Sequence, residues 1–162
     1  MGVGQSRWRP PYLPARSSAR CRAECNSSVA AGEDFTFCVL PDGQVAAYGL
    51  NAESLPALPD GVVYEGVMAG SAHAVLLRSD GRAIAVGANS EGQCEVPDLR
   101  AGGSSSSAAD IEDALYVNAA AGTAHTVLVR SNGCVITCGF GGGGRCDVPN
   151  LPDGIAYVAA AA

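Results

Sequence analysis

Apolar and polar positions follow one another along this chain in a unit that occurs three times. Each unit has a short apolar run, an Asp-Gly or Asn-Gly pair, and a second apolar run. The first runs are residues 35–40, 74–78 and 126–130, and the second runs are residues 45–48, 83–86 and 135–138. Because Asp-Gly and Asn-Gly favour tight turns, each unit is predicted to form a β-hairpin. The runs are nearly continuous in apolar residues, which is typical of strands covered on both faces.

Nine glycines hold the three copies in one register. Each copy has a glycine before its first run, a second glycine eleven residues later and a third glycine six residues beyond that. The nine are Gly32, Gly43 and Gly49, then Gly70, Gly81 and Gly87, then Gly122, Gly133 and Gly139. No window of this region has the apolar stripe of a capped helix, so the predicted fold class is all-β, built from stacked repeats.

The spacing also predicts the domain organisation. Residues 1–28 are rich in Arg, Pro and Ser and are predicted to be disordered. Residues 29–162 are predicted to hold the repeats, with copies near 29–66, 67–116 and 117–162 and a Ser/Gly-rich insertion at 100–114. Counted from the third glycines, Pro59 should align with Pro97 and Pro149. The chain stops where the first glycine of a fourth copy is due, so we expect an array that is cut off.

Charge and cysteine usage narrow the class of partner. The chain has no lysine, and residues 29–162 hold five arginines against fifteen acidic residues, a net charge of −10. This balance disfavours direct binding of nucleic acid. Seven cysteines and the lack of an apolar secretion signal in residues 1–28 predict reduced thiols in an intracellular protein, in the cytoplasm or the nucleus. No apolar run is long enough to span a membrane.

The second and third copies share the pattern Gly-x-x-His-x-Val-Leu-x-Arg-Ser-Asp/Asn-Gly, followed by a strand that ends at Gly87 or Gly139. With the Gly92-Gln93 pair after it, this pattern resembles the regulator-of-chromosome-condensation repeat. Relatives in that family include the exchange factor for the nuclear GTPase Ran, HECT ubiquitin ligases, a plant ultraviolet photoreceptor and beta-lactamase-inhibitor protein II. The chain departs from the family where Tyr48, Val86 and Cys138 replace the usual tryptophan.

The resemblance implies a β-propeller, usually of seven four-stranded blades, of which this chain would supply about three. Three copies cannot close such a ring. The sequence therefore leaves three outcomes open: a fragment of a larger ring, self-association, or an open arc with exposed edge strands.

Residues that recur in every copy are predicted to belong to the framework. His73 and His125 share a position that Phe35 fills in the first copy, and we expect them to bond to neighbouring loops. Arg78 and Arg130 also recur and are expected to pair with acidic residues at the surface. We assign no catalytic, cofactor-binding or metal-binding residue, because no set of ligands converges.

Three further motifs suggest chemistry or attachment, and each also has a simpler structural explanation. Residues 139–144 match a dinucleotide fingerprint, but no helix start follows them, so a phosphate site is disfavoured. Cys94 and Cys146 lie beside acidic residues, which argues for packing rather than a nucleophilic thiol. The N-terminal sequence at Gly2 fits N-myristoylation, with Cys21 and Cys25 available for a second acyl chain. Membrane attachment is predicted only if Gly2 carries that lipid.

The predicted function is a non-enzymatic scaffold that binds another protein, with no cofactor. Binding is expected in the segments that differ between copies, which are residues 50–56, 88–95, 100–114 and 140–146. The alternative is a fragment of a larger regulatory protein, such as a HECT-type ubiquitin ligase or a guanine-nucleotide exchange factor for a small GTPase. Further blades or a second copy of the chain would be additional partners.

Overall fold

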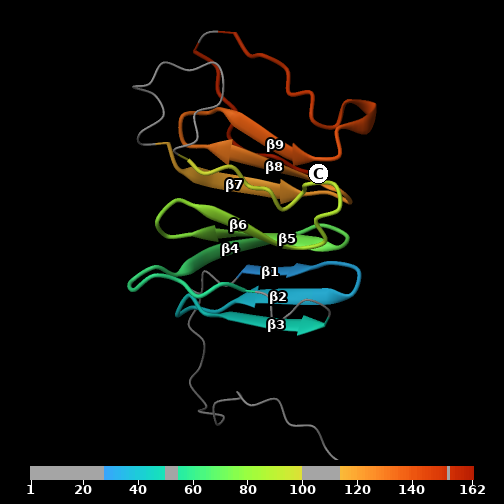
Figure 1. The fold of residues 1–162 in the computed structure, drawn as a ribbon. Helices are drawn as coiled ribbons and strands as arrows, with labels where there is room; N and C mark the ends of the chain where they lie inside the picture. Colours follow the sequence, from blue (N-terminus) through green and yellow to red (C-terminus); the bar gives the residue numbers. More distant parts are fainter. Residues whose placement is uncertain (1–27, 50–54, 100–113, 153) are drawn as a thin grey trace, which may run out of the picture.

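The computed structural model of the chain describes residues 28–49, 55–99, 114–152 and 154–162. In these residues the strands form three antiparallel sheets, which lie side by side in chain order (Figure 1). The sheets contain β1 (Ser28–Ala31), β2 (Phe35–Val39) and β3 (Val45–Gly49); β4 (Tyr64–Ala69), β5 (His73–Arg78) and β6 (Ala83–Gly87); and β7 (Tyr116–Ala121), β8 (His125–Arg130) and β9 (Val135–Gly139). A short 3-10 turn, η2 (Gly142–Gly144), follows β9. The prediction of an all-β fold with propeller-type blades is confirmed.

Each sheet has its middle strand between the other two, so β2, β5 and β8 are the strands made by the first apolar runs. Their hairpin partners β3, β6 and β9 are the second runs, as predicted. The strands β1, β4 and β7 were not predicted, because their short sequences contain residues with little preference for strands: alanines in β1 and β7, and Glu65 and Gly66 in β4. The resemblance implied four strands in each blade, whereas each sheet in the described residues has three.

The first glycine of each copy has the same surroundings in all three sheets. The backbone N–H groups of Gly32, Gly70 and Gly122 donate to the carbonyl oxygens three residues later, at 2.9, 2.8 and 2.9 Å. A Cβ atom on Gly70 would collide with the Gly122 carbonyl oxygen and would lie 2.9 Å from the His73 ring. Neighbouring sheets can therefore approach each other only because this position carries no side chain.

The second glycine of each copy joins one sheet to the next. Gly43, Gly81 and Gly133 have φ angles of +76°, +75° and +78°, which favour glycine at the end of a hairpin turn. Their carbonyl oxygens accept hydrogen bonds from the backbone N–H groups of Tyr64, Tyr116 and Tyr157, at 3.2, 2.8 and 3.2 Å. Each hairpin turn is thus fixed to the segment that begins the following blade.

The same tyrosines fasten the tail of one copy to the next copy, in a contact that we call the tyrosine clasp. The hydroxyl groups of Tyr64, Tyr116 and Tyr157 donate to the carbonyl oxygens of Pro56, Pro97 and Pro149, at 3.4, 2.8 and 2.7 Å. Burial raises the pKa of Tyr64 and of Tyr116, which keeps these two hydroxyl groups protonated. The predicted alignment of Pro59 is therefore wrong, because Pro56 makes this contact and the tail of the first copy is shorter than the glycine spacing suggested.

The hydrophobic cores lie between sheets. In the second and third sheets, we call the face that is turned to the preceding sheet the front face, and the opposite face the back face. In the first sheet, the back face is the one that is turned to the second sheet, and the front face is the other one. The first core joins back-face residues of the first sheet to front-face residues of the second, and the second core joins the second sheet to the third in the same way. The first core contains Ala30, Phe35, Phe37, Val39, Val45 and Ala47 opposite Val67, Ala69, Ala74, Leu76, Ile84 and Val86. The second contains Met68, Val75, Leu77, Ala83 and Ala85 opposite Ala119, Ala121, Leu128, Ile136 and Cys138.

Two sequence predictions concern residues that the structure describes little or not at all. The predicted disordered segment, residues 1–28, lies outside the described residues except for Ser28, which begins β1. Gly2, Cys21 and Cys25, on which the lipidation hypothesis rests, also lie outside them. Within the described residues, no helix has the length and apolar character needed to cross a lipid bilayer.

Candidate functional site

One end of the three sheets carries the loops that differ between copies, and we call it the loop end. There the last strand of a sheet leaves beside the turn between the first two strands. The backbone N–H of Ala88 donates to Ala72 at 2.8 Å, and that of Phe140 donates to Ala124 at 2.9 Å. The predicted binding segments 88–95 and 140–146 are therefore placed at the same end (Figure 1, right). Of the predicted segments 50–56 and 100–114, residues 50–54 and 100–113 lie outside the described residues.

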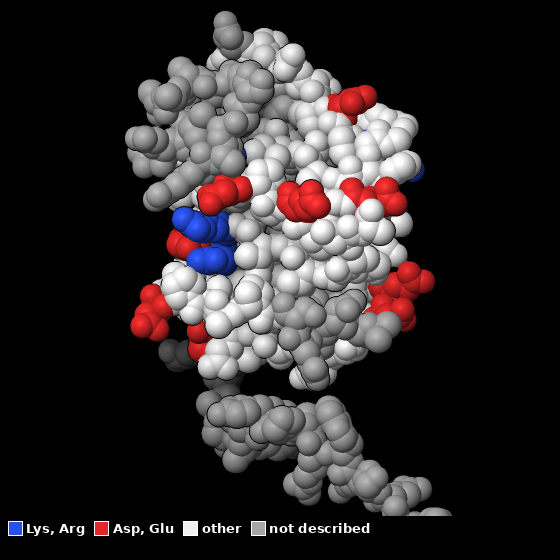
Figure 2. Space-filling view, viewed as in Figure 1, with Lys and Arg blue, Asp and Glu red and all other residues white. Residues whose placement is uncertain are grey.

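The loop end is acidic. Its described acidic residues are Glu33, Asp34, Glu91, Glu95 and Asp147. The basic residue described there is Arg145, whose guanidinium carbon lies 5.4 Å from the centroid of the Phe140 ring. Figure 2 shows acidic side chains scattered widely over the face that it presents. A surface of this charge attracts basic partners and repels phosphate groups.

An open hollow of about 490 Å³ lies at the loop end, where the three first glycines meet. It is lined by residues 31–33, 69–71 and 121–123 and by Ala162. The Ser71 hydroxyl donates to Glu33 Oε2 at 3.0 Å, and the Glu33 backbone N–H donates to the Ser71 carbonyl oxygen at 2.9 Å. The hollow is lined by one carboxylate, that of Glu33, and by several small residues. This lining suits a hydrogen bond from a donor group of a partner protein better than it suits catalysis.

His73 is buried between the second and third sheets. Its Nε2 lies 2.9 Å from Thr126 Oγ1, and the Thr126 hydroxyl donates to the Gln93 carbonyl oxygen at 2.8 Å. Because the hydroxyl has only one proton, it must accept a hydrogen bond from His73, so the proton of the imidazole is on Nε2. His73 thus packs within the framework, but its direct partner lies on strand β8 and not in a neighbouring loop as expected, and the loop residue Gln93 is reached only through Thr126. We call this chain of bonds the histidine lock.

The other ring nitrogen of His73 fits a neutral imidazole. Nδ1 is buried and has no hydrogen-bond partner among the described residues. Burial lowers the pKa of His73, and the nearby His125 lowers it further. His125 takes the equivalent position in the third sheet, but its ring is only partly buried. The two histidines therefore share a position and differ in what covers them.

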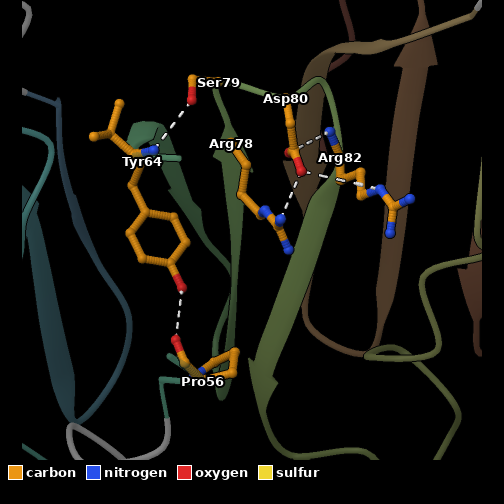
Figure 3. A network of polar contacts seen from close by, with 7 residues as sticks. Pro56, Tyr64, Arg78, Ser79, Asp80 and Arg82 are labelled. Atoms are coloured by element: carbon orange, nitrogen blue, oxygen red, sulfur yellow. Dashed lines mark hydrogen bonds and ion pairs between the residues drawn. The ribbon is translucent and has the colours of Figure 1, made fainter. Parts of the chain in front are cut away.

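Arg78 lies in a polar network at the turn between β5 and β6 (Figure 3). Its Nη2 is 2.6 Å from Asp80 Oδ2, while Arg82 Nε is 4.0 Å from the same oxygen. Figure 2 shows a compact basic area at the level of this turn, with acidic side chains beside it. Both arginines line a small hollow of about 210 Å³ that also includes Tyr116. The predicted pairing of Arg78 with an acidic residue is confirmed.

Arg130 differs from Arg78 although the two positions are equivalent. Its guanidinium carbon lies 5.6 Å from the centroid of the Tyr116 ring, and its side chain is buried. Its Nε and Nη2 have no hydrogen-bond partner among the described residues. The predicted surface ion pair is therefore not found for Arg130 in the described part of the chain, where the contact with the tyrosine ring takes its place.

The described cysteines are free thiols, in agreement with the sequence prediction. Cys94 donates through Sγ to the Ala88 carbonyl oxygen at 3.2 Å, and Cys146 makes the equivalent contact with Phe140 at 3.8 Å. Burial raises the pKa of Cys94 to about 11, with a further contribution from Cys138. The Cys94 thiol is therefore protonated at neutral pH, which agrees with a packing role.

The remaining motifs build no chemical site among the described residues. Residues 142–144 form only the 3-10 turn η2, in which Gly143 has a left-handed φ of +73°, so the α-helix that a dinucleotide fingerprint needs does not follow. Within the described ranges, no group of three or more His, Cys, Asp or Glu side chains is placed to hold a metal ion.

The comparison with known families agrees with the repeated geometry. Residues 67–93 match the model of the Regulator of chromosome condensation (RCC1) repeat. This match runs from the middle of β4 through β5, with the histidine position, and β6 to Gln93. Residues 67–93 thus carry a repeat of the RCC1 type. The resemblance seen in the sequence is thus confirmed.

Solved structures of similar fold support the propeller architecture. Human WBSCR16 is similar with a TM-score of 0.57 and 24% identity, over 82% of this chain and 38% of that one. Prp20p from Saccharomyces cerevisiae gives 0.57 and 22% over 76% and 35%. Yeast RCC1 (Prp20) in complex with Kap60 gives 0.52 and 24% over 70% and 32%. The chain therefore spans about a third of the length of these proteins. No curated protein sequence matches the chain.

Proposed function

We propose that the chain is a non-enzymatic protein-interaction module in which RCC1-type blades hold the loop end as the binding surface. The observation that carries this proposal is a contrast between positions. Glycines and tyrosines that join the blades recur in all copies, whereas segments 88–95 and 140–146 differ: the first carries Glu91 and Glu95, and the second carries Arg145 and is followed by Asp147. Loops on a rigid frame commonly carry recognition. We take residues 29–162 as the repeat domain and place the protein in the cytoplasm or the nucleus.

The acidic loop end suggests a basic protein as the partner. The study of Prp20p concerned its binding to Gsp1p and histones, and histones are strongly basic. Among the described residues of the loop end, acidic side chains outnumber basic ones. Their negative charge is therefore available to a partner. We propose that a basic protein surface of the histone type binds there.

The test uses purified core histones as the probe. Replacement of Glu91 and Glu95 by Lys reverses two exposed charges at the loop end, and we expect at least a tenfold loss of affinity in about 0.15 M salt. The matched control replaces Asp42 and Asp60 by Lys in turns at the opposite end, with the same change in net charge, and should lose less than threefold. Equal losses in both variants, or no binding by the unmodified chain, would refute the proposal.

A second candidate is a part of a larger regulatory protein, and it is favoured by the chain's match to only about a third of Prp20p. In that case the blades would contact a small GTPase. The expected result is faster release of labelled GDP from a Ran-type GTPase in the presence of the chain. An unchanged rate of GDP release would argue against exchange activity, and the interaction module would then be the proposed function that stands. For the HECT-type alternative, the decisive observation is a HECT domain encoded in the same reading frame.

A further inference from the structure

Two sheet faces of the molecule pack against no other sheet within the described residues. One is the front face of the first sheet, formed by Val29, Ala31, Thr36, Cys38, Ala46 and Tyr48. The other is the back face of the third sheet, formed by Ala120, His125, Val127, Val129, Val135 and Thr137. Neither face carries a charged residue. On the front face Val29 and Tyr48 are 65% and 58% exposed, whereas on the back face Ala120 and Val129 are 6% and 0% exposed, beside the C-terminal residues that bond to Asn118 through Ala160. Both faces have the composition of an interface rather than of a solvated surface.

The interior of the molecule shows which surface fits such a face. A back face packs against the front face of the next sheet twice within this chain, with the same positions in contact each time. The glycine contacts and the tyrosine clasp repeat at both junctions. A front face of this repeat type is therefore the natural cover for the back face of the third sheet.

The polar residues on the two open faces identify which front face fits. At the first junction Phe35 lies opposite Ala74, and both are apolar. At the second junction His73 bonds to Thr126, which occupies the position equivalent to Ala74. The open back face presents His125 at the histidine position, so it requires a hydroxyl group opposite. The open front face of the first sheet carries Thr36 at that position.

We propose that the back face of the third sheet binds the front face of the first sheet in a second copy of this chain. In the complex His125 of one molecule donates to Thr36 of the other, as His73 donates to Thr126 inside each molecule. The contact is head to tail, so both molecules keep one open face and the assembly grows into a ring or a filament. This inference does not depend on the partner proposed for the loop end.

The C-terminal residues define how the second copy is seated. Tyr157 bonds to Gly133 and Pro149, as Tyr116 bonds to Gly81 and Pro97, so residues 157–162 run where the next blade begins. In the second copy β1 would occupy the position of residues 159–162. Those residues are weakly held: Val158 beside them is 83% exposed, and the hydrogen bond that attaches them to β7 runs from Ala160 N–H to Asn118 Oδ1, at 3.0 Å. We expect β1 of the second copy to displace residues 159–162.

The decisive experiment uses one variant for each face. Val29→Asp places a charge on the open front face, and Val127→Asp places one on the open back face. The unmodified chain should self-associate in sedimentation-velocity runs as concentration rises, whereas each variant alone should stay monomeric. A mixture of the two variants should form a one-to-one dimer and no larger species, because one intact face of each kind is left. Dimer formation in the mixture also shows that both variants are folded.

Three results would overturn the inference. They are a monomeric unmodified chain at all concentrations tested, self-association of either variant alone, and a mixture that stays monomeric while the unmodified chain associates. Phe140→Ser is the control for nonspecific hydrophobic association, because Phe140 is 44% exposed and lies on neither face. This variant should associate as the unmodified chain does, and a loss of association equal to that of Val29→Asp would refute the assignment of the faces.

The polar pair gives a second, independent readout. Thr36→Ala or His125→Phe alone should weaken self-association about tenfold, because one change leaves a polar group without its partner. The double variant recreates the pairing of Phe35 with Ala74 and should recover most of the affinity. Deletion of residues 159–162 should strengthen association, since it removes the competitor of β1. No recovery in the double variant, or weaker association after the deletion, contradicts this seating of the two copies.

Discussion

The two junctions between sheets have the same backbone contacts but different side chains in their cores. At the first junction the centroids of the Phe35 and Phe37 rings lie 5.4 Å apart, edge to face, and they fill the space with aromatic bulk. At the second junction the equivalent positions carry His73 and Val75, and the histidine lock replaces part of that bulk. An apolar junction accepts many apolar neighbours, whereas a buried hydrogen bond accepts only a partner with the matching group. The second junction is thus the more selective of the two.

Removal of an aromatic side chain from the first junction should have the largest effect on the stability of the chain. Phe37 is 1% exposed, and Phe37→Ala should lower the free energy of unfolding by about 3–5 kcal/mol. Val75→Ala at the equivalent position of the second junction should lower it by about 2 kcal/mol, since fewer atoms are lost. Urea unfolding measures both values. Equal losses would show that the first junction does not depend on its larger side chains.

The turns that join the blades should come next. Gly81 and Gly61 have nearly the same φ, +75° and +79°, but a Cβ atom would meet Leu115 at Gly81 and nothing within 4 Å at Gly61. Gly61→Ala should therefore destabilise by about 1 kcal/mol through the backbone alone, and Gly81→Ala by about 2–4 kcal/mol. Thermal and urea unfolding compare the two variants. A similar loss in both would mean that Leu115 moves away at no cost.

The histidine lock should show a smaller effect but strong coupling. Thr126→Ala leaves His73 Nε2 without its acceptor and the Gln93 carbonyl oxygen without its donor, at a cost of about 1–3 kcal/mol. The double variant His73→Phe with Thr126→Ala copies the pairing of Phe35 with Ala74. It should be more stable than the sum of the two single changes by at least about 0.5 kcal/mol. Additive losses would show that the two side chains do not act as a pair.

The pH dependence of the second junction should be the smallest effect. Burial, with a contribution from His125, holds the pKa of His73 below its ordinary value of 6.5 in the folded chain. The unfolded chain therefore binds a proton at a higher pH, and stability should fall as the pH drops below about 6.5, by no more than about 1.4 kcal/mol per pH unit. Urea midpoints at two pH values measure the slope. The double variant should lose this part of the slope, and an unchanged slope would assign it to other groups.

The parts of the fold that depend on local sequence could be predicted. Asp80-Gly81 and Asn132-Gly133 favour their turns whatever lies around them, so β5, β6, β8 and β9 were found from the residues alone. The pairing of Arg78 with Asp80 is local as well. The strands β1, β4 and β7 could not be found in this way, because their sequences have little local preference for strands and become strands through pairing with a neighbour.

The contacts between blades could not be predicted, because they join residues far apart in the sequence. His73 and Thr126 are separated by 53 positions, and neither residue alone indicates the other. Pro59 was chosen by counting from a glycine, whereas the clasp depends on the distance back from Tyr64, which is eight residues for Pro56. Pro149 stands eight residues before Tyr157 as well, so counting back from the tyrosines would have found the correct proline.

The tyrosine clasp also marks a place where the protein can be rebuilt. Pro97 and Tyr116 are 19 positions apart, against eight in the other two copies, yet their bond keeps the same form. Both ends of the intervening stretch are therefore anchored whatever its length. A foreign epitope or a reporter domain grafted between residues 99 and 114 would start and finish at fixed points, and we expect the three sheets to keep their packing.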